Sequence, residues 1–370
     1  MTIKGIKKTL LKKGPKRRDP INPKDLLKTG STVLDLAISG RRGGGFLKGK
    51  YFWMVGDSSS GKTFLMLTCF AEASINPEFD KYRLIYDNRE DGALMDMAKY
   101  FGRAMAERTE PPKDPDKYDD PYSENIEDFY FNLDDALERA EAGEPFIYLL
   151  DSMDSLTSKY ADEKFKEAKK EARGGARAKG DYGDGKAKKN STFLRKAVNR
   201  LGATGSILII LSQIRDNIEA GMFEEHQTPS GGHALRFYAT VQLWSSVGSK
   251  IKKKVAGRDV VVGVNCRVRT KKNRITGRER TVEFPIYYDT GIDDIGGMID
   301  FLIHWKFWTK NKMGTIDATP DFDDVKKRKE DLVEWIEEED LREDLEEIVE
   351  DAYAEVERKA TVKRGNKYFR

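Results

Sequence analysis

The segment from residue 56 to residue 63 combines glycines, hydroxyl groups and one lysine in a spacing that suits phosphate groups. It reads Gly56, Asp57, Ser58, Ser59, Ser60, Gly61, Lys62 and Thr63, and it fits the phosphate-loop pattern at every fixed position. Glycines let backbone N–H groups approach phosphate oxygens, and the start of a helix favours their negative charge. The segment predicts a nucleotide site in which Lys62 reaches the β- and γ-phosphates of ATP and Thr63 binds Mg²⁺.

Carboxylates at the ends of two apolar runs could complete this site. The run at residues 146–150 ends in Asp151, where a carboxylate can hold the water shell of Mg²⁺ beside a phosphate loop. Hydrolysis also needs a group that orients or deprotonates the attacking water. Glu90 is our choice for this role, and Asp87 and Asp91 in the same acidic stretch remain alternatives.

These residues need strands and helices to position them. Short apolar runs predict strands at residues 51–55, 83–86, 146–150, 207–211, 239–245, 265–270 and 281–287. Helical stretches should follow the first four of them. This alternation is typical of an α/β fold with a mostly parallel central sheet. The Pro- and Asp-rich stretch at residues 111–121 predicts a surface loop.

The charge is segregated along the chain, although the net charge is only +3 over 370 residues. Residues 1–18 carry eight lysines and arginines and no acid, and residues 250–280 are also strongly basic. Residues 330–357 are acidic instead. Such blocks indicate a polyanion as the partner of the basic segments, with solvated faces as the alternative.

We divide the chain into a basic arm at residues 1–28, a core at residues 29–295 and a small C-terminal domain at residues 296–370. Gly296 and Gly297 mark the second boundary. Beyond them, apolar residues recur at helical spacing, which predicts two acidic amphipathic helices.

Several classes of protein are excluded by composition. Two distant cysteines argue against a disulfide framework, and the three histidines show no zinc-like spacing. No apolar run approaches the roughly 20 residues that span a bilayer. The basic N-terminus has no hydrophobic stretch behind it and so is no secretory signal. We therefore expect a cytoplasmic protein with no membrane partner.

Two segments downstream of these motifs add a family resemblance. Residues 206–215 read Ser-Ile-Leu-Ile-Ile-Leu-Ser-Gln-Ile-Arg, and residues 228–239 read Thr-Pro-Ser-Gly-Gly-His-Ala-Leu-Arg-Phe-Tyr-Ala. Together they resemble the fourth core strand, second DNA-binding loop and following helix of the RecA recombinase family. The opening Thr-Gly-Ser at residues 29–31 is also similar to the entry of the RecA core. The resemblance covers roughly residues 29–305 and implies a RecA-type phosphate-loop ATPase core.

The resemblance implies roles for further residues. Gln213 matches the family's sensor glutamine, whose uncharged amide can bond phosphate or water without titrating. Residues 214–232 match the second DNA loop, and the first would fall within residues 159–190, although this stretch looks longer and richer in lysine than in the family. The implied DNA contacts are Arg195, Arg215, Gly231, Gly232, His233 and Arg236.

Lys272 and Arg274 match two basic family residues that approach the γ-phosphate of a neighbouring subunit, like arginine fingers. A DNA-binding patch is the alternative interpretation of this cluster. Glu90 departs from the family by one inserted residue. The run from residue 86 to residue 92 approaches the Tyr-Asp-x-Glu-x-Gly of phage recombinases of the UvsX branch, which favours a phage origin and hence the host cytoplasm.

The function implied is an ATP-dependent DNA recombinase that forms helical homo-oligomers on single-stranded DNA and exchanges strands with double-stranded DNA. A single-strand-binding protein or a loader would be a further partner. Two alternatives remain open. A RecA-like ring helicase or regulatory ATPase would lack the Gly-Gly-x-Ala-Leu-x-Phe-Tyr run after the loop, whereas the displaced Glu90 suits a DNA-coating protein that hardly hydrolyses ATP.

Overall fold

The structure is a computed structural model that describes residues 21–90, 95–161, 163–165, 169, 185–216, 227–229, 232–362 and 364. Asp91, Gly231 and most of the predicted first DNA loop at residues 159–190 lie outside these residues, as does the arm before residue 21. No helix in the described parts of the chain is long and apolar enough to cross a membrane.

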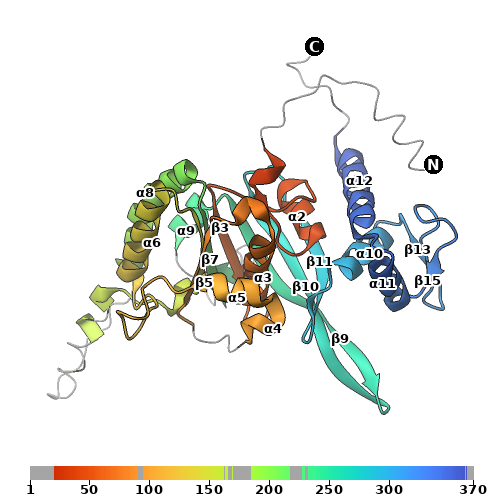
Figure 1. The fold of residues 1–370 in the computed structure, drawn as a ribbon, viewed down its shortest axis with the longest axis horizontal. Coiled ribbons are helices and arrows are strands. Elements are labelled where there is room, and N and C mark those ends of the chain that lie inside the picture. The colour runs from red at the N-terminus through yellow and green to blue at the C-terminus, as the bar shows by residue number, and fades with distance from the viewer. Residues whose placement is uncertain are drawn as a thin grey trace.

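A ten-stranded sheet forms the centre of the molecule (Figure 1). Along its path the order is β12-β11-β10-β9-β3-β7-β6-β4-β5, and β8 pairs with β7 outside that path. The strands are β3 (Tyr51–Gly56), β4 (Arg83–Asn88), β5 (Thr109–Glu110), β6 (Phe146–Asp151), β7 (Ile207–Asp216), β8 (Gln227–Pro229), β9 (Val241–Val255), β10 (Arg258–Asn273), β11 (Thr281–Tyr287) and β12 (Gly291–Ile292). Strands β9, β3, β7, β6, β4 and β5 are parallel, whereas β10, β11 and β12 are antiparallel additions. Every strand expected from the sequence is present, so the predicted α/β fold with a mostly parallel sheet is confirmed.

Helices cover both faces of the sheet, which explains why its central strands are continuous apolar runs. Successive side chains of β3 enter opposite cores: Phe52 and Met54 join one cluster, and Trp53 and Val55 join the other. One face carries α2 (Thr32–Ser39), α3 (Lys62–Ile75), α4 (Met97–Phe101), α5 (Arg103–Arg108) and α10 (Asp294–His304). The other carries α6 (Ile126–Glu141), α8 (Gly185–Thr204) and α9 (His233–Tyr238). Helices thus follow the first four predicted strands, and residues 111–121 form no helix or strand, as expected.

The C-terminal region contains the two predicted amphipathic helices, α11 (Lys329–Glu338) and α12 (Arg342–Ala360). It also contains α10 and a small sheet that the sequence did not predict, formed by β13 (Thr309–Lys310), β14 (Ile316–Asp317) and β15 (Lys326–Lys327). Gly296 and Gly297, our proposed boundary, lie inside α10 and are buried. Leu332 and Leu345 join the same apolar cluster as the core helices. The C-terminal helices therefore share the core of the sheet, and the division into domains stays a prediction.

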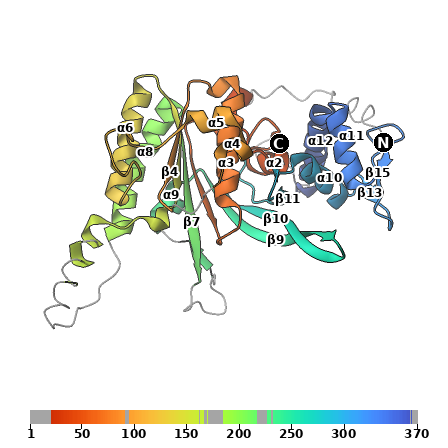
Figure 2. The same cartoon turned by 60° about the horizontal axis from the view of Figure 1, so that its bottom comes forward.

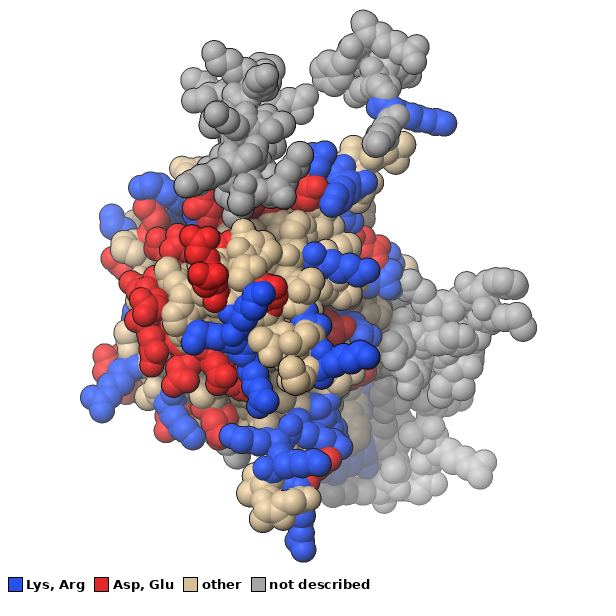
Figure 3. Space-filling model, turned by 90° about the vertical axis from the view of Figure 1, so that its right-hand side faces the viewer, with Lys and Arg blue, Asp and Glu red and all other residues tan. Residues whose placement is uncertain are grey.

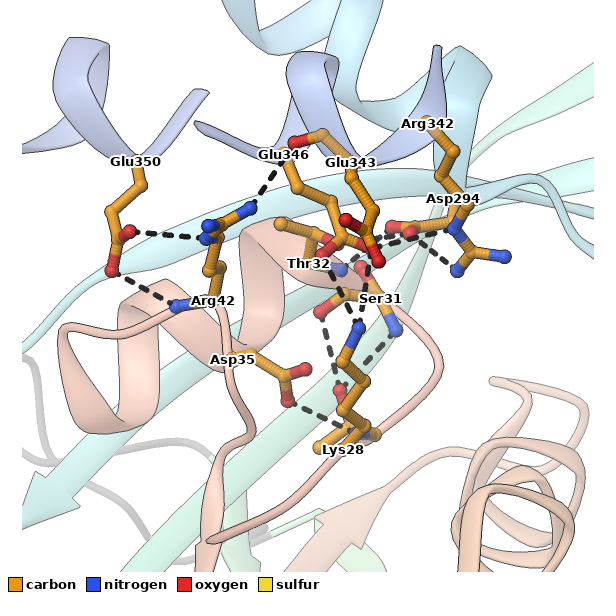
Figure 4. Close-up of polar contacts among 11 residues, drawn as sticks. Lys28, Ser31, Thr32, Asp35, Arg42, Asp294, Arg342, Glu343, Glu346 and Glu350 are labelled. Atoms are coloured by element: carbon orange, nitrogen blue, oxygen red, sulfur yellow. Dashed lines mark hydrogen bonds and ion pairs between the residues drawn. The ribbon is translucent and has the colours of Figure 1, made fainter. Parts of the chain in front are cut away.

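A polar network fixes α12 to the start of the core (Figure 4). The buried carboxylate of Asp294 accepts hydrogen bonds from the Thr32 N–H at 2.6 Å and the Thr32 hydroxyl at 2.9 Å. Arg342 at the start of α12 donates to the same carboxylate at 3.1 Å. Lys28 donates to Glu346 on the next turn of α12 at 3.2 Å. Burial raises the pKa of Asp294, and Arg342 opposes that rise.

Strands β9 and β10 continue past the sheet as a projecting hairpin (Figure 1). Ala256 and Gly257 at its tip both have positive φ, which is the geometry of a two-residue hairpin turn. The exposed basic side chains of the projecting part are Lys252, Lys253, Lys254 and Arg258. Figure 3 shows lysine and arginine gathered toward the bottom of this side of the molecule and acidic side chains on another part of it.

Arg342→Ala is expected to lower the free energy of unfolding by about 1–2 kcal/mol, because it leaves Asp294 buried beside Glu346 without its cation while water partly replaces a half-exposed side chain. The loss should be larger at pH 8 than at pH 4, since a carboxyl whose pKa is raised above its ordinary value is at least partly protonated in the folded protein at the lower pH. Urea unfolding at both pH values measures this.

Arg358→Ala on the same helix is the matched control. Arg358 is exposed and pairs with Glu355, so its loss should cost less than about 0.5 kcal/mol. Equal losses for the two variants would contradict the role given to the network.

Candidate nucleotide site and DNA-facing surface

The phosphate loop connects the carboxyl end of β3 to the start of α3. Gly61 precedes the helix with a φ of 82°, in the left-handed region that favours glycine. The Lys62 ammonium turns back into the loop and donates to the carbonyl oxygens of Gly56 at 2.9 Å and Asp57 at 2.7 Å. Burial lowers the pKa of Lys62, and Glu90 and Asp151 oppose that shift. The loop thus places a largely buried lysine beside a helix N-terminus, and both of them favour a bound anion.

Strand β9 supports the loop from the side. The Ser60 and Ser245 hydroxyls lie 2.8 Å apart, and Ser60 also donates to the Asp57 carbonyl at 2.8 Å. A Cβ at Gly56 would lie 2.1 Å from the Ser245 hydroxyl oxygen and 2.6 Å from its backbone oxygen. Gly56 is therefore required by close packing as well as by its place in the motif. Ser245 was not among the residues predicted from the sequence.

Thr63 and Asp151 come together at the start of α3. The Thr63 hydroxyl donates to Asp151 Oδ2 at 2.6 Å, and the Tyr86 hydroxyl approaches the same oxygen at 3.4 Å. Asp151 Oδ1 is buried and has no hydrogen-bond partner among the described residues. Burial, followed by Glu90, raises the pKa of Asp151 to about 6. A hydroxyl beside a buried, unsatisfied carboxylate oxygen fits Mg²⁺, which takes oxygen ligands.

Glu90 and Gln213 lie together at the same edge of the sheet. Gln213 Nε2 donates to Glu90 Oε1 at 3.0 Å, although one residue comes from the end of β4 and the other from β7. The Glu90 N–H donates to the Asp151 carbonyl at 2.8 Å, which holds Glu90 over the end of β6. The structure therefore brings together Lys62, Asp151, Glu90 and Gln213, four of the residues that the sequence analysis assigned to the nucleotide site.

Asp87, an alternative to Glu90, has a different environment. Its side chain is fully buried, and it accepts hydrogen bonds from the backbone and hydroxyl of Ser123 and from the Tyr148 hydroxyl at 2.7 Å. Burial raises the pKa of Asp87, and these hydrogen bonds oppose the rise. These contacts link β4 to β6 and the start of α6. Asp87 is thus occupied in holding the fold, whereas Asp91 lies outside the described residues.

The residues predicted to contact DNA are spread around the loops. Beyond Gln213, β7 leaves the parallel sheet and pairs with β8, with Arg215 opposite Thr228 (Figure 2). His233 and Arg236 are exposed on α9, which begins after Gly232 at a φ of 83°. Arg195 is exposed on α8. Strands β7 and β9 both continue past Gly56 at the end of β3, and in Figure 2 β7 points to the bottom of the view while the β9–β10 hairpin runs to the right.

Lys272 and Arg274 lie near the opposite edge of the sheet. Lys272 lies opposite Gln242 of β9, and Gln242 lies opposite Trp53, near the start of β3. Its ammonium donates to the carbonyl oxygens of Arg236 and Phe237 at the end of α9, and Arg274 donates to the Phe237 carbonyl at 2.9 Å. Burial, together with the nearby Arg274 and Arg236, lowers the pKa of Lys272 to about 8. The structure therefore does not bring these two cations to the phosphate loop of their own chain.

Proteins named Protein RecA are similar to this chain along most of its length. The one from Cytophaga hutchinsonii is 30% identical over 285 residues, which cover 74% of this chain and 67% of the relative. The one from Colwellia psychrerythraea is 29% identical over 299 residues, which cover 77% of this chain and 72% of the relative. A family model described as the RecA N-terminal domain matches residues 171–293.

Gly56→Ala is expected to lower the free energy of unfolding by about 1–3 kcal/mol, because the added methyl group overlaps the backbone of Ser245. Gly43→Ala is the control, since nothing lies within 4 Å of a Cβ at that position. Thermal unfolding of both variants measures the difference. A Gly56→Ala protein as stable as the control would show that β9 does not constrain the loop.

Proposed function

This chain belongs to the RecA family, and we propose that it is an ATP-dependent DNA recombinase that assembles on single-stranded DNA and exchanges strands with a homologous duplex. The observation that carries the proposal is the hydrogen bond between Gln213 and Glu90. It joins a carboxylate at the nucleotide site to the strand that continues directly into the second DNA loop. Nucleotide chemistry and DNA binding would be linked through this strand.

In this proposal the phosphate loop holds ATP through its backbone N–H groups and Lys62. Thr63 and Asp151 would hold Mg²⁺, which neutralises developing charge on the phosphates when it is bound. Glu90 would orient and polarise the attacking water, with Gln213 fixing its carboxylate. The bond to Gln213 draws Glu90 into the site despite the inserted residue, and this favours hydrolysis over a DNA-coating role with little turnover.

DNA would bind along the edge from which β7 and the basic hairpin project. The second loop, with Gly231 and Gly232 as backbone donors and Arg215 and Arg236 as cations, would contact phosphates. Lysines two residues apart on a strand lie about 7 Å from each other, so Lys252 and Lys254 could follow a DNA backbone. Contacts of this kind make binding tolerant of sequence and sensitive to salt.

Assembly of copies would complete the nucleotide site. Lys272 and Arg274 lie near the sheet edge opposite the phosphate loop, so a head-to-tail neighbour could bring its cations to this chain's nucleotide. Repetition of such a contact gives a helical filament. ATP would then control assembly because it lies between successive copies, and a single-strand-binding protein or loader would act on that assembly.

ATP hydrolysis should rise at least about tenfold when single-stranded DNA is added, because DNA assembles the shared site. Steady-state phosphate release with and without DNA measures this. Lys62→Ala should abolish turnover, since it removes the cation that stabilises the transferred phosphate, a loss of about 10²-fold or more. The exposed Lys81→Ala is the matched control. A rate of ATP hydrolysis that is the same with and without DNA, or that is unchanged in Lys62→Ala, would contradict the proposal.

Glu90→Gln should lower kcat by about 10²–10³-fold while KM for ATP stays within about threefold, because it removes the group that activates water. Asp87→Asn should instead lower the free energy of unfolding by about 1–3 kcal/mol, since it disturbs a buried hydrogen-bond network. Stopped-time hydrolysis assays and urea unfolding separate the two effects. A normal kcat in Glu90→Gln would remove Glu90 from the mechanism.

A further inference from the structure

Asp154 makes a contact at the nucleotide site that the sequence did not predict. It lies in a one-turn 3₁₀ helix, η3 (Met153–Ser155), that directly follows β6. Its Oδ2 accepts a hydrogen bond from the backbone N–H of Gln213 at 2.7 Å. An amide bonded to a carboxylate forms one of the stronger hydrogen bonds available to a backbone.

This hydrogen bond takes the place of the backbone pairing that β7 loses where β6 ends. The last paired residues of β6 and β7 are Leu150 and Ile210, yet β7 continues to Asp216. Beyond Ile210 the backbone of β7 no longer has β6 beside it, and buried backbone donors need partners. The Asp154 carboxylate supplies an acceptor three residues further along, at Gln213.

Gln213 is thereby held from three directions. On one side β7 pairs with β3, with Gln213 opposite Gly56 of the phosphate loop. On the other side Asp154 binds its backbone, and its side chain binds Glu90. The next residue, Ile214, already pairs with β8 in the second DNA loop. Asp154 therefore acts at the junction between the phosphate loop and the DNA loop.

We propose that Asp154 is a positioning residue that couples the nucleotide site to the second DNA loop by holding the Gln213 backbone; this inference rests on the proposed function. Its carboxylate is one of several acids, with Glu90, Asp151 and Asp57, that act on Lys62. Phosphates that bind at this site bring negative charge toward the Asp154 carboxylate and compete with it for Lys62. The resulting repulsion weakens its hold on Gln213, so the end of β7 moves with the nucleotide state.

The test compares Asp154→Ala, which removes the acceptor, with Asp154→Asn, which keeps a neutral one. Each is assayed for ATP turnover without DNA and for the concentration of single-stranded DNA that gives half-maximal stimulation. Asp154→Ala should lower that DNA concentration by about tenfold, because β7 is then released as in the nucleotide-bound protein; this is the size expected when one charge-assisted hydrogen bond is lost. Asp154→Asn should shift it in the same direction by about threefold, and KM for ATP without DNA should not rise in either variant, because the carboxylate that repels the phosphates is gone. Ser155→Ala in the same turn is the matched control.

Two kinetic results would overturn the inference. A DNA response of Asp154→Ala equal to that of the wild type would show that the contact carries no coupling. An equal loss of turnover with and without DNA, not rescued by Asp154→Asn, would show that Asp154 only supports the fold of the site.

Hydrogen exchange separates failure of this inference from failure of the proposed function, because it needs no DNA response. In the wild-type chain, amides of residues 211–216, which lie beyond the pairing with β6, should exchange faster once ATPγS and Mg²⁺ are bound. In Asp154→Ala they should exchange fast with and without nucleotide. Wild-type exchange that nucleotide does not change would overturn the role of Asp154, whatever the outcome of the DNA assays.

Discussion

The parallel pairing of β3, β7, β6 and β4 is the constraint on which the rest of the site depends. Parallel strands end at a common edge, so residues far apart in the chain meet there without a loop having to carry them. Gly56, Glu90, Asp151 and Gln213 are brought together in this way. The helices on both faces then exclude water from the strands and fix the register of these ends.

At this edge of the sheet the acidic side chains outnumber the lysine that they surround. Lys62 is largely buried and faces Glu90, Asp151, Asp57 and Asp154. Burial raises the pKa of Asp151 and lowers that of Lys62, so burial makes both charges costly. Mg²⁺ would supply a positive charge beside Asp151, and phosphates would supply negative charge beside Lys62. The Thr63 hydroxyl donates to Asp151 and the Gln213 amide donates to Glu90, and these hydrogen bonds hold both carboxylates in place.

Much of this could be predicted from the sequence, because the signals are local. The phosphate loop is a contiguous pattern, and Asp151 and Gln213 follow apolar runs that form strands. Contacts across the fold gave no such signal. Ser245 supports the loop from β9, and Asp154 reaches Gln213 because β6 ends early. The sheet β13–β15 and helix α10 were missed because short strands and a glycine pair carry weak periodicity.

Strand exchange itself tests the central claim most directly. A single strand is coated with the protein and mixed with a duplex of the same sequence whose strands carry a donor and an acceptor dye, and loss of energy transfer is followed over time. The account predicts loss of transfer with ATP and a homologous duplex, and none with Lys62→Ala or an unrelated duplex. DNA-stimulated hydrolysis without any exchange would contradict it and would leave an ATPase of the RecA family with a different task.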